Sequence, residues 1–454
     1  MRRVCLTLPT HRACSGTIAA IGEEAAYGAR EFGVEVHLLI LDSSPAPVLA
    51  EHRAAVAALP ASPGVTVHHL DEDEQRAFLR EVIARSGAAS TSTAASASAS
   101  TAADRLLGLM LPSSRVSYGA CTNRAFLIAQ ALGCTSVHRR DSDSRYQHLD
   151  GEPVFPLHQE LAHLGQRADD VRKSATRSKL PPGSGDRRVA VAGGSFVGEM
   201  SVDVAEIREL DPDTYGELIG LSLPEGYPEF VRKHLIDESF RGAGNGTFDG
   251  DRTTLAPISP MRVDMCNIAL DHEVYRRVPL PPATDTIGSD YFLLHLAHDA
   301  RLPGLQHNRH IVNFHTAERR TDDGFLAYQL RFAKFLLAKT YLNAVYARTA
   351  KAGDALLDAG GHLQASVVAG YVRDSVDLDR TEVARRLDVI DRAYRRLGGR
   401  YPTVADTLAE NSGRLLDEAR NDMADFAFLM DHWEALAGAS AEAGLEQQVR
   451  AVTR

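Results

Sequence analysis

The chain has 454 residues, of which 44% are hydrophobic and 24% are charged, the ordinary balance of a soluble globular protein with one large domain or two or three smaller ones. The formal net charge of -10 argues against a general nucleic-acid binder, and no apolar run is long enough to span a membrane. The five cysteines are odd in number and form no C-x-x-C pair, which favours a reducing compartment, so we expect a cytoplasmic protein.

The first 70 residues alternate between apolar runs and one amphipathic stretch. The elements predicted here are, in chain order, a strand at 3–9 that ends at Pro9, a helix at 14–33 with Gly33 as its stop, a strand at 34–44 that ends in a turn at Asp42, and a strand at 65–70. A strand, a helix and a strand at the start of the chain predict an α/β protein with a parallel sheet.

The next segment, 87–104, consists mostly of Ala, Ser and Thr, and we expect it to be a mobile surface loop. A helix is predicted at 117–133 and a short strand at 134–140. Asp141 and Asp143 follow this strand directly. Their place matters because ligands of open α/β sheets usually bind at the carboxyl ends of strands.

The rest of the chain contains a basic segment, a glycine-rich segment and a long region with a helical pattern. Residues 167–188 carry seven Lys or Arg against three Asp, which indicates a solvated linker or, alternatively, a lid over a phosphorylated ligand. The glycine-rich segment 242–251 neither follows a strand nor opens a helix, so it is not a dinucleotide-binding loop. Beyond about residue 325 the pattern is helical. One apolar stripe there predicts a core helix or a homodimer interface: Phe325, Tyr328, Phe332 and Phe335.

The Asp141–Asp143 pair is the strongest candidate for chemistry, although short acidic turns are common. A calcium EF-hand loop starting at Asp141 fails, because Arg145 occupies a liganding position and Tyr146 stands where the sharp turn needs glycine. Residues two apart in an extended segment point the same way, so both carboxylates can face one cation. Hard oxygen ligands suit Mg²⁺ or Mn²⁺, which usually also bind substrate phosphates.

The order of these pieces over residues 1–320 resembles a GT-A glycosyltransferase, an enzyme that uses a nucleotide-sugar donor. The matching pieces are "LTLPTHR" at the first strand, Asp42 at the end of the second, Asn123-Arg124 on the helix before the D-x-D motif, Asp141 and Asp143 as that motif, "DMCNIALDHEVYRRV" on the acceptor side, "TIGSDYFLLHLAH" with Asp290, and "HIVNFHTAERR" with its histidines. The branch it most resembles is the mitomycin-type aminosugar transferases of antibiotic gene clusters.

The resemblance implies a GT-A-like mixed sheet flanked by helices, with a C-terminal helical extension. It implies a nucleotide-sugar half at 1–160, an acceptor half at 161–325 and a helical region at 326–454. The cofactor would be Mn²⁺ or Mg²⁺, the donor a UDP-sugar, and the acceptor a small molecule or a group bound to a carrier protein. The implied site residues are Pro9, Thr10, Arg12, Asp42, Asn123, Arg124 and Asp141 for the nucleotide, Asp141, Asp143 and His315 for the metal, and Asp290 as the acceptor-side base.

Several alternatives stay open on the sequence alone. The metal-ligating histidine could be His310 instead of His315, since the two point to opposite faces of one predicted strand. Asp290 could be an ordinary first-turn aspartate, and Arg319 or Arg320 could assist the diphosphate. Two other functions compete with glycosyl transfer: a sugar-nucleotidyltransferase, and a non-catalytic nucleotide-binding or scaffold protein.

Overall fold

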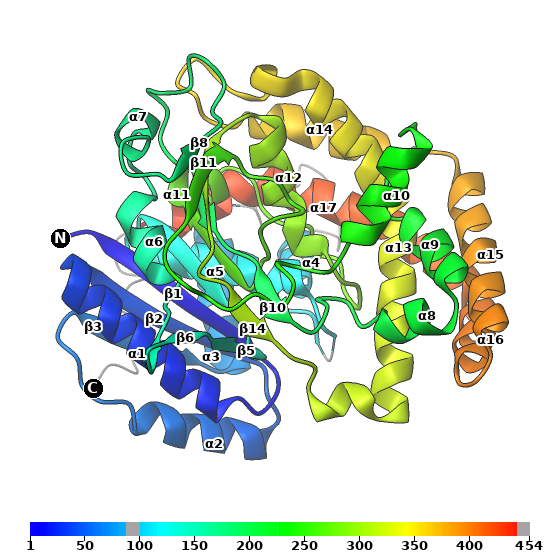
Figure 1. Ribbon diagram of the computed structural model, residues 1–454, viewed down its shortest axis with the longest axis horizontal. Helices are drawn as coiled ribbons and strands as arrows, with labels where there is room; N and C mark the ends of the chain where they lie inside the picture. Colours follow the sequence, from blue (N-terminus) through cyan, green and yellow to red (C-terminus); the bar gives the residue numbers. More distant parts are fainter. Residues whose placement is uncertain (88–99, 114, 225, 443–454) are drawn as a thin grey trace.

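The computed structural model describes residues 1–87, 100–113, 115–224 and 226–442. Its centre is a nine-stranded mixed sheet (Figure 1). In spatial order its strands are β3 (Val65–Leu70), β2 (Glu35–Asp42), β1 (Arg3–Thr10), β4 (Ser136–Arg140), β12 (Asn267–Asp271), β9 (Val191–Gly193), β13 (Pro303–His307), β11 (Thr253–Pro257) and β8 (Arg177–Ser178). The four strands from β3 to β4 are parallel, and β12 runs antiparallel to both of its neighbours.

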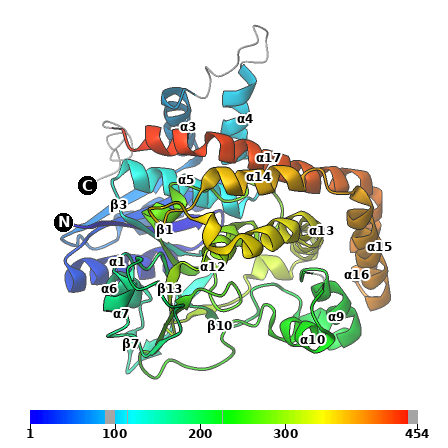
Figure 2. The ribbon, with the colours of Figure 1, turned by 90° about the horizontal axis from the view of Figure 1, so that it is seen from above.

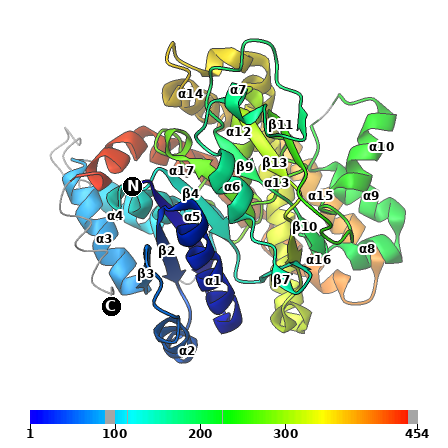
Figure 3. The ribbon, with the colours of Figure 1, turned by 60° about the vertical axis from the view of Figure 1, so that its left-hand side comes forward.

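Successive residues of β1 and β2 point to opposite faces of the sheet, and both faces are buried, which explains why these strands are continuous apolar runs in the sequence. Leu6 of β1 and its partner Leu38 of β2 face helix α1 (Ser15–Phe32), whereas Cys5 and Leu39 belong to the core on the opposite face. Both faces of these strands are therefore buried, as in parallel sheets covered by helices on each side. Figure 3 shows α1 in front of β1 and β2, with α17 behind them.

The helices that complete the first half cover both faces of the sheet. They are α2 (Ala46–Ala57), α3 (Glu72–Arg85), α4 (Ser100–Met110), α5 (Tyr118–Ala131), α6 (Leu157–His163) and α7 (Ala168–Val171). Gly33 ends α1 with φ 59, a left-handed conformation that glycine adopts at no steric cost, as the sequence predicted. The predicted mobile loop 87–104 lies mostly outside the described residues, and α4 begins at its 100–104 end.

A small three-stranded sheet is formed by the segments that follow the inner strands β4, β9 and β13 of the main sheet. It consists of β10 (Phe196–Gly198), β14 (Ile311–Asn313) and β5 (Ser144–Tyr146), and a hairpin of β6 (His148–Leu149) and β7 (Glu152–Pro153) follows β5. This sheet joins the segment after β4 to the segment before the long helix α13. It therefore brings residues near 143 close to residues near 315, although they are far apart in the chain.

The second half contains the remaining helices. They are α8 (Ala205–Leu210), α9 (Pro212–Gly220), α10 (Glu229–Glu238), α11 (His272–Tyr275), α12 (Phe292–Asp299), α13 (Asp322–Ala352), α14 (Ala365–Ser375), α15 (Arg380–Leu397), α16 (Tyr401–Glu410) and α17 (Ser412–Ser440), with three 3-10 turns, η1 (Ser289–Tyr291), η2 (Ala317–Arg320) and η3 (Gly353–Leu356). The α/β class, the mixed sheet flanked by helices and the C-terminal helical region are confirmed.

The C-terminal helices share the hydrophobic core of the sheet. One cluster of buried residues extends from Cys5 of β1 to Ala439 of α17, and the Trp433 indole of α17 donates a hydrogen bond to the Tyr275 carbonyl at 2.8 Å. Figure 2 shows α17 running alongside α3 and α5 towards α15 and α16. The apolar stripe on α13 is buried inside this core, so it gives the chain no dimer interface. Nowhere in the described ranges does a helix combine the length and the apolar character that a bilayer span requires.

Candidate functional site

A cavity of about 910 Å³ lies between the carboxyl ends of the parallel strands and the helices α12 and α13. The loop after β1, the residues flanking the end of β2 and the segment after β4 line one part of it. Helix α13 and the start of α12 line the other part. Because ligands of open α/β sheets bind outside the carboxyl ends of the strands, this cavity is the candidate active site.

Seven of the predicted site residues line the cavity, and three do not. Those in the lining are Pro9, Thr10, Arg12, Arg124, Asp141, Asp143 and Asp290. Asp42, Asn123 and His315 lie outside it, and each is held by protein groups instead. No member of the 167–188 segment lines the cavity either, which favours the linker interpretation over the lid.

Two consecutive arginines hold the end of β4 from opposite faces of the sheet. Arg140, with a side chain only 1% exposed, points away from the cavity and pairs with Glu24 of α1 at 2.8 Å and Glu160 of α6 at 3.0 Å. Arg139 points into the cavity, as neighbouring strand residues do on alternate faces. Asp141 and Asp143 are thus attached to a strand end that is fixed on both sides.

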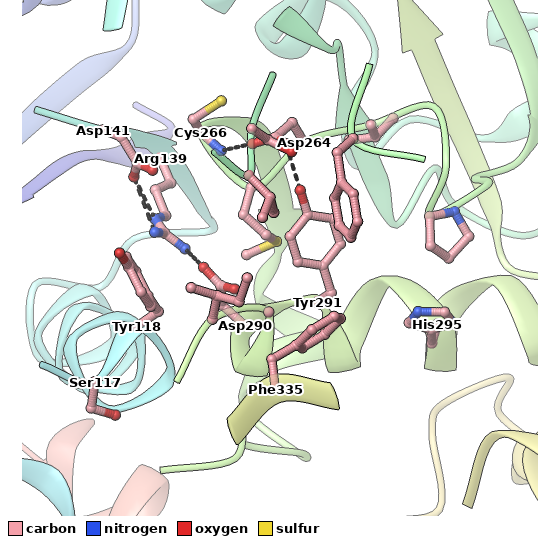
Figure 4. A pocket seen from close by; sticks show the side chains of 18 of the residues that line it. Ser117, Tyr118, Arg139, Asp141, Asp264, Cys266, Asp290, Tyr291, His295 and Phe335 are labelled. Atoms are coloured by element: carbon pink, nitrogen blue, oxygen red, sulfur yellow. Dashed lines mark hydrogen bonds and ion pairs between the residues drawn. The ribbon is translucent and has the colours of Figure 1, made fainter. Parts of the chain in front are cut away.

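Arg139 connects the D-x-D segment to the predicted base. Its guanidinium group lies 2.6 Å from Asp290 Oδ2 and 3.0 Å from Asp141 Oδ1 (Figure 4). Asp290 stands in the 3-10 turn η1, two residues before the first residue of α12, which agrees with its predicted place at a helix start. Gly288, with φ 70, opens this turn, and a Cβ there would come within 2.8 Å of the Phe335 ring. The Asp290 Oδ1 atom makes no hydrogen bond to any residue that the structure describes.

Negative charge accumulates around Asp141. Although 27% of its side chain stays exposed to the cavity, loss of water around the carboxyl is the largest cause that raises its pKa to about 6. Arg139 lowers this pKa, whereas Asp143, Asp290 and Asp264 all raise it. Asp264 opens the segment predicted on the acceptor side but was not predicted as a site residue; it lines the cavity and accepts a hydrogen bond from the Tyr291 hydroxyl at 2.5 Å (Figure 4).

Two further guanidinium groups converge on Asp143. Arg12 from the β1–α1 loop lies 3.3 Å from Asp143 Oδ2, and Arg319 from η2 lies 3.5 Å from the same oxygen. The Arg319 guanidinium also stacks over the Tyr328 ring, with 4.8 Å to the ring centroid. The cavity wall therefore presents two fixed cationic forks beside the acidic pair, an arrangement suited to a diphosphate.

Asp42, predicted as a nucleotide contact, lies in a buried histidine cluster. Its Oδ2 atom accepts hydrogen bonds from His52 at 2.7 Å and from His69 at 2.9 Å. The His52 Nε2 atom accepts from the Cys14 backbone N–H at 3.0 Å, so His52 is the neutral tautomer with its proton on Nδ1. Burial opposes ionisation of Asp42, but the bonds from His69, Ser44 and His52 prevail and lower its pKa. Asp42 therefore positions the start of α1 and the β1–α1 loop, which lines the cavity.

An Asp42→Ala variant should lose about 3 kcal/mol of unfolding free energy, because two buried imidazoles would lose the carboxylate that pairs them. Urea denaturation at pH 7 measures this loss, with Glu51→Ala on the exposed face of α2 as the control. Since the pKa of Asp42 is lowered on folding, its contribution is present at neutral pH and declines as the pH falls below about 4. An unchanged midpoint in urea would show that Asp42 is free to serve a ligand.

Asn123 and Arg124, predicted to contact the nucleotide, differ in their surroundings. The Asn123 amide donates to the Leu280 carbonyl and accepts from the Leu280 N–H, both at 2.8 Å, and it is fully buried. One turn earlier, a Cβ at Gly119 would fall 1.9 Å from the Pro281 carbonyl oxygen. This face of α5 is thus packed against the 280–281 backbone. Arg124 lines the cavity while its Nε donates to Gln75 at 2.7 Å.

The two candidate histidine ligands are both engaged elsewhere. His315 Nε2 lies 2.9 Å from the Met200 carbonyl, and His310 Nδ1 accepts from the Ser195 N–H at 3.0 Å. Strand β14 ends at Asn313, so the predicted strand is shorter than expected and His315 follows it in a loop. Within the ranges that the structure describes, no three His, Cys, Asp or Glu side chains are arranged to hold a metal ion.

The residues present fit a cation held by two carboxylates and a substrate, and not one enclosed by protein ligands. Asp141 and Asp143 both face the cavity, and the crowded carboxylates that raise the Asp141 pKa would be relieved by a cation. Mg²⁺ is commonly bound through one or two carboxylates together with substrate phosphates and waters. The histidine is therefore not needed for such a site.

Comparisons with known proteins show a family and distant likenesses to solved structures, including a mannosyltransferase and a xylosyltransferase. A family model described as a family of unknown function (DUF6271) matches residues 2–449. No curated protein matches the sequence. Among solved structures, mannosyltransferase PcManGT from Pyrobaculum calidifontis, in complex with GDP-Man and Mn²⁺, is 13% identical with a TM-score of 0.33 over 97% of this chain and 87% of that one. Mouse xyloside xylosyltransferase 1, in its apo form, is 12% identical with a TM-score of 0.22 over 64% of this chain and 72% of that one. Likenesses this distant do not identify an activity.

Proposed function

The chain belongs to the family of unknown function DUF6271, and we propose that it is a GT-A-type glycosyltransferase that moves a sugar from a nucleoside-diphosphate sugar to an acceptor. The observation that carries this proposal is the meeting of two carboxylates and two guanidinium groups at the end of β4. These groups are Asp141, Asp143, Arg12 and Arg319. A diphosphate and a divalent cation are the ligands whose charges such a set complements.

In the proposed reaction, the bond between the anomeric carbon and the diphosphate oxygen breaks, and the diphosphate leaves with the electron pair. A new bond forms from the anomeric carbon to a hydroxyl or amine of the acceptor, and the acceptor's proton passes to a carboxylate. Arg12 and Arg319 bind the diphosphate and offset its growing charge with fixed donors. A Mn²⁺ or Mg²⁺ ion held by Asp141 and Asp143 would supply Lewis-acid stabilisation of the same charge.

Asp290 is the proposed base for the acceptor. Arg139 holds its Oδ2 atom in place, and its Oδ1 atom makes no hydrogen bond to a described residue, so Oδ1 is available to take a proton. A base must be fixed within hydrogen-bonding reach of the proton that it removes. The ion pair and the buried residues of α12 provide this fixation.

For the donor and the acceptor, the proposal names only chemical classes. A UDP-sugar is the first donor to test, and the acceptor is a small molecule or a group carried by a partner protein, from natural-product biosynthesis. The wall of the cavity formed by α13 includes the aromatic and apolar side chains of Phe335, Leu342 and Tyr346, which suits a non-sugar acceptor.

A thermal-shift panel of nucleoside diphosphates with and without Mn²⁺ tests the proposal. We expect UDP with Mn²⁺ to raise the melting temperature more than UDP or Mn²⁺ alone, because ligand at one hundred times its dissociation constant stabilises a protein by ~2.7 kcal/mol. Uridine, which has the same base and ribose but no diphosphate, is the matched control for the diphosphate charge. If no nucleoside diphosphate shifts the melting temperature with Mn²⁺ or Mg²⁺, the proposal is wrong.

A further inference from the structure

The part of the cavity farthest along α13 holds polar groups that the proposed reaction does not use. We call it the α13 end and define it by His295 of α12 and by Phe335, Lys339, Asn343 and Tyr346 of α13. The four α13 positions recur every three or four residues, so they lie on one face of that helix. This face forms a wall of the cavity.

Two buried lysines on the same helix differ completely in their partners. Lys334 is 2% exposed and lies 3.1 Å from Glu418, 3.2 Å from Asp422 and 2.8 Å from the Thr284 carbonyl. Lys339 is 9% exposed, yet its ammonium makes no hydrogen bond and no ion pair to any described residue. A lysine that is nine-tenths buried and has no counter-charge among the described residues is costly, which indicates that a ligand supplies the missing partner.

The surroundings of Lys339 are aromatic. Its Nζ atom lies 5.0 Å from the centroid of the Tyr346 ring and 5.9 Å from that of the Phe335 ring. Burial, followed by the charge of Arg386, lowers the pKa of Lys339 to about 8. The lysine is therefore still largely protonated at neutral pH.

Two other polar groups at the α13 end also lack partners. The Asn343 Oδ1 atom is buried without a hydrogen bond, although the Asn343 Nδ2 atom donates to the Ser222 carbonyl at 3.4 Å. His295 stacks on Tyr346 with ring centroids 4.0 Å apart and makes no hydrogen bond to a described residue. Burial, followed by the charge of Lys339, keeps the pKa of His295 well below its usual range, so the imidazole is neutral.

We propose that the α13 end binds an anionic group, a carboxylate or a phosphate, on a ligand whose aromatic or apolar body lies against Phe335 and Tyr346. The ammonium of Lys339 pairs with the anion, and the Asn343 carbonyl oxygen accepts a hydrogen bond from the ligand. That this ligand is the sugar acceptor rests on the proposed function. The anion site itself rests only on the unpaired lysine and its aromatic walls.

Calorimetric titration with three small aromatic probes tests the site. Benzoate should bind the wild-type protein about 10-fold more tightly than neutral benzamide, because one charge-assisted hydrogen bond separates them. Lys339→Gln should remove this difference, and Lys351→Gln, at an exposed lysine on the same helix, should keep it. Phenyl phosphate titrated beside benzoate distinguishes a phosphate ligand from a carboxylate ligand. Equal affinities of all three probes for the wild-type protein would overturn the proposal.

The stability of methionine variants provides an independent measurement. Lys339→Met should keep or raise the melting temperature, because it removes a buried charge that has no protein partner. Lys334→Met should lower it, because Glu418 and Asp422 would lose their shared counter-charge. A fall with Lys339→Met as large as that with Lys334→Met would assign Lys339 a structural role and overturn the proposal.

The outcomes separate this proposal from the proposed function. Binding of UDP with Mn²⁺ concerns the groups at the end of β4, and Lys339→Gln should leave it unchanged. If UDP binds but the wild-type protein prefers neither benzoate nor phenyl phosphate to benzamide, the anion site is wrong and glycosyl transfer stands. If benzoate is preferred through Lys339 but no nucleoside diphosphate binds, the anion site stands and its ligand is not a sugar acceptor.

Discussion

An Asp143→Ala variant should lose about 1,000-fold or more of the proposed Mn²⁺-dependent turnover of a nucleotide sugar while the protein stays folded. A bound cation contributes several kcal/mol of charge stabilisation to such reactions, and Asp143 is one of only two cavity carboxylates in the D-x-D segment. Steady-state rates over a range of Mn²⁺ concentrations give the measurement. Asp388→Ala, at an exposed aspartate on α15, is the matched control.

The same variant makes a second, opposite change that only the arginine geometry predicts. Arg12 and Arg319 lie 3.3 and 3.5 Å from the Asp143 carboxylate, so its removal frees both guanidinium groups. Metal-free UDP should therefore bind the variant as tightly as the wild-type protein or more tightly, whereas the gain in affinity from Mn²⁺ disappears. Calorimetry with UDP, with and without Mn²⁺, measures the metal-free affinity and the gain from Mn²⁺ separately. Full Mn²⁺-dependent activity in the variant would refute the metal role of Asp143.

An Asp290→Asn variant should lose about 100-fold or more in turnover on its acceptor, a typical share for general base catalysis. The amide oxygen can still accept a hydrogen bond from Arg139, so the change removes the proton acceptor and keeps the fold of η1. UDP affinity, measured by calorimetry, should barely change. The loss should also shrink for an aromatic amine acceptor, which attacks as a neutral nucleophile.

Asp264→Asn is the control for Asp290→Asn, because it removes a second carboxylate that lines the cavity. Asp264 lines the same part of the cavity, but the Tyr291 hydroxyl and the Cys266 N–H already occupy its two oxygens. Its replacement should therefore cost less turnover than that of Asp290. The reverse order would move the base to Asp264. A collapse of UDP binding in Asp290→Asn would place Asp290 in the nucleotide site instead.

The sequence was sufficient to predict the first strands, their helix and the place of the D-x-D segment. Apolar runs broken at Pro9, Asp42 and Asp141 mark the ends of β1, β2 and β4, and parallel strands bring their carboxyl ends to one edge of a sheet. The cavity then lies where three loops meet. This reasoning needs only local patterns and one topological rule, which is why it succeeded.

Side-chain partners distant in the sequence could not be predicted in this way. Asp42 is paired with histidines 10 and 27 residues away, and Asn123 with a backbone group 157 residues away, so neither is left for a nucleotide. For the same reason Asp264 was not predicted as a site residue, although it opens the segment predicted on the acceptor side, because its partner Tyr291 lies 27 residues away. The contrast between Lys334 and Lys339 could not be predicted either. A lysine in an apolar helix gives the same sequence pattern whether or not a carboxylate lies beside it.

Helix α13 gives the cavity a fixed length. Its cavity-lining residues run from Tyr328, under the Arg319 guanidinium, to Ala350 near its end, which spans ~33 Å at 1.5 Å per residue. Since one helix carries this whole wall, each successive turn marks a step farther from the Arg319 guanidinium at its start. Substitutions at Phe335, Leu342 and Ala350 would therefore select acceptors by size at graded depths, while a single inserted residue would rotate every later position off the wall by about 100°.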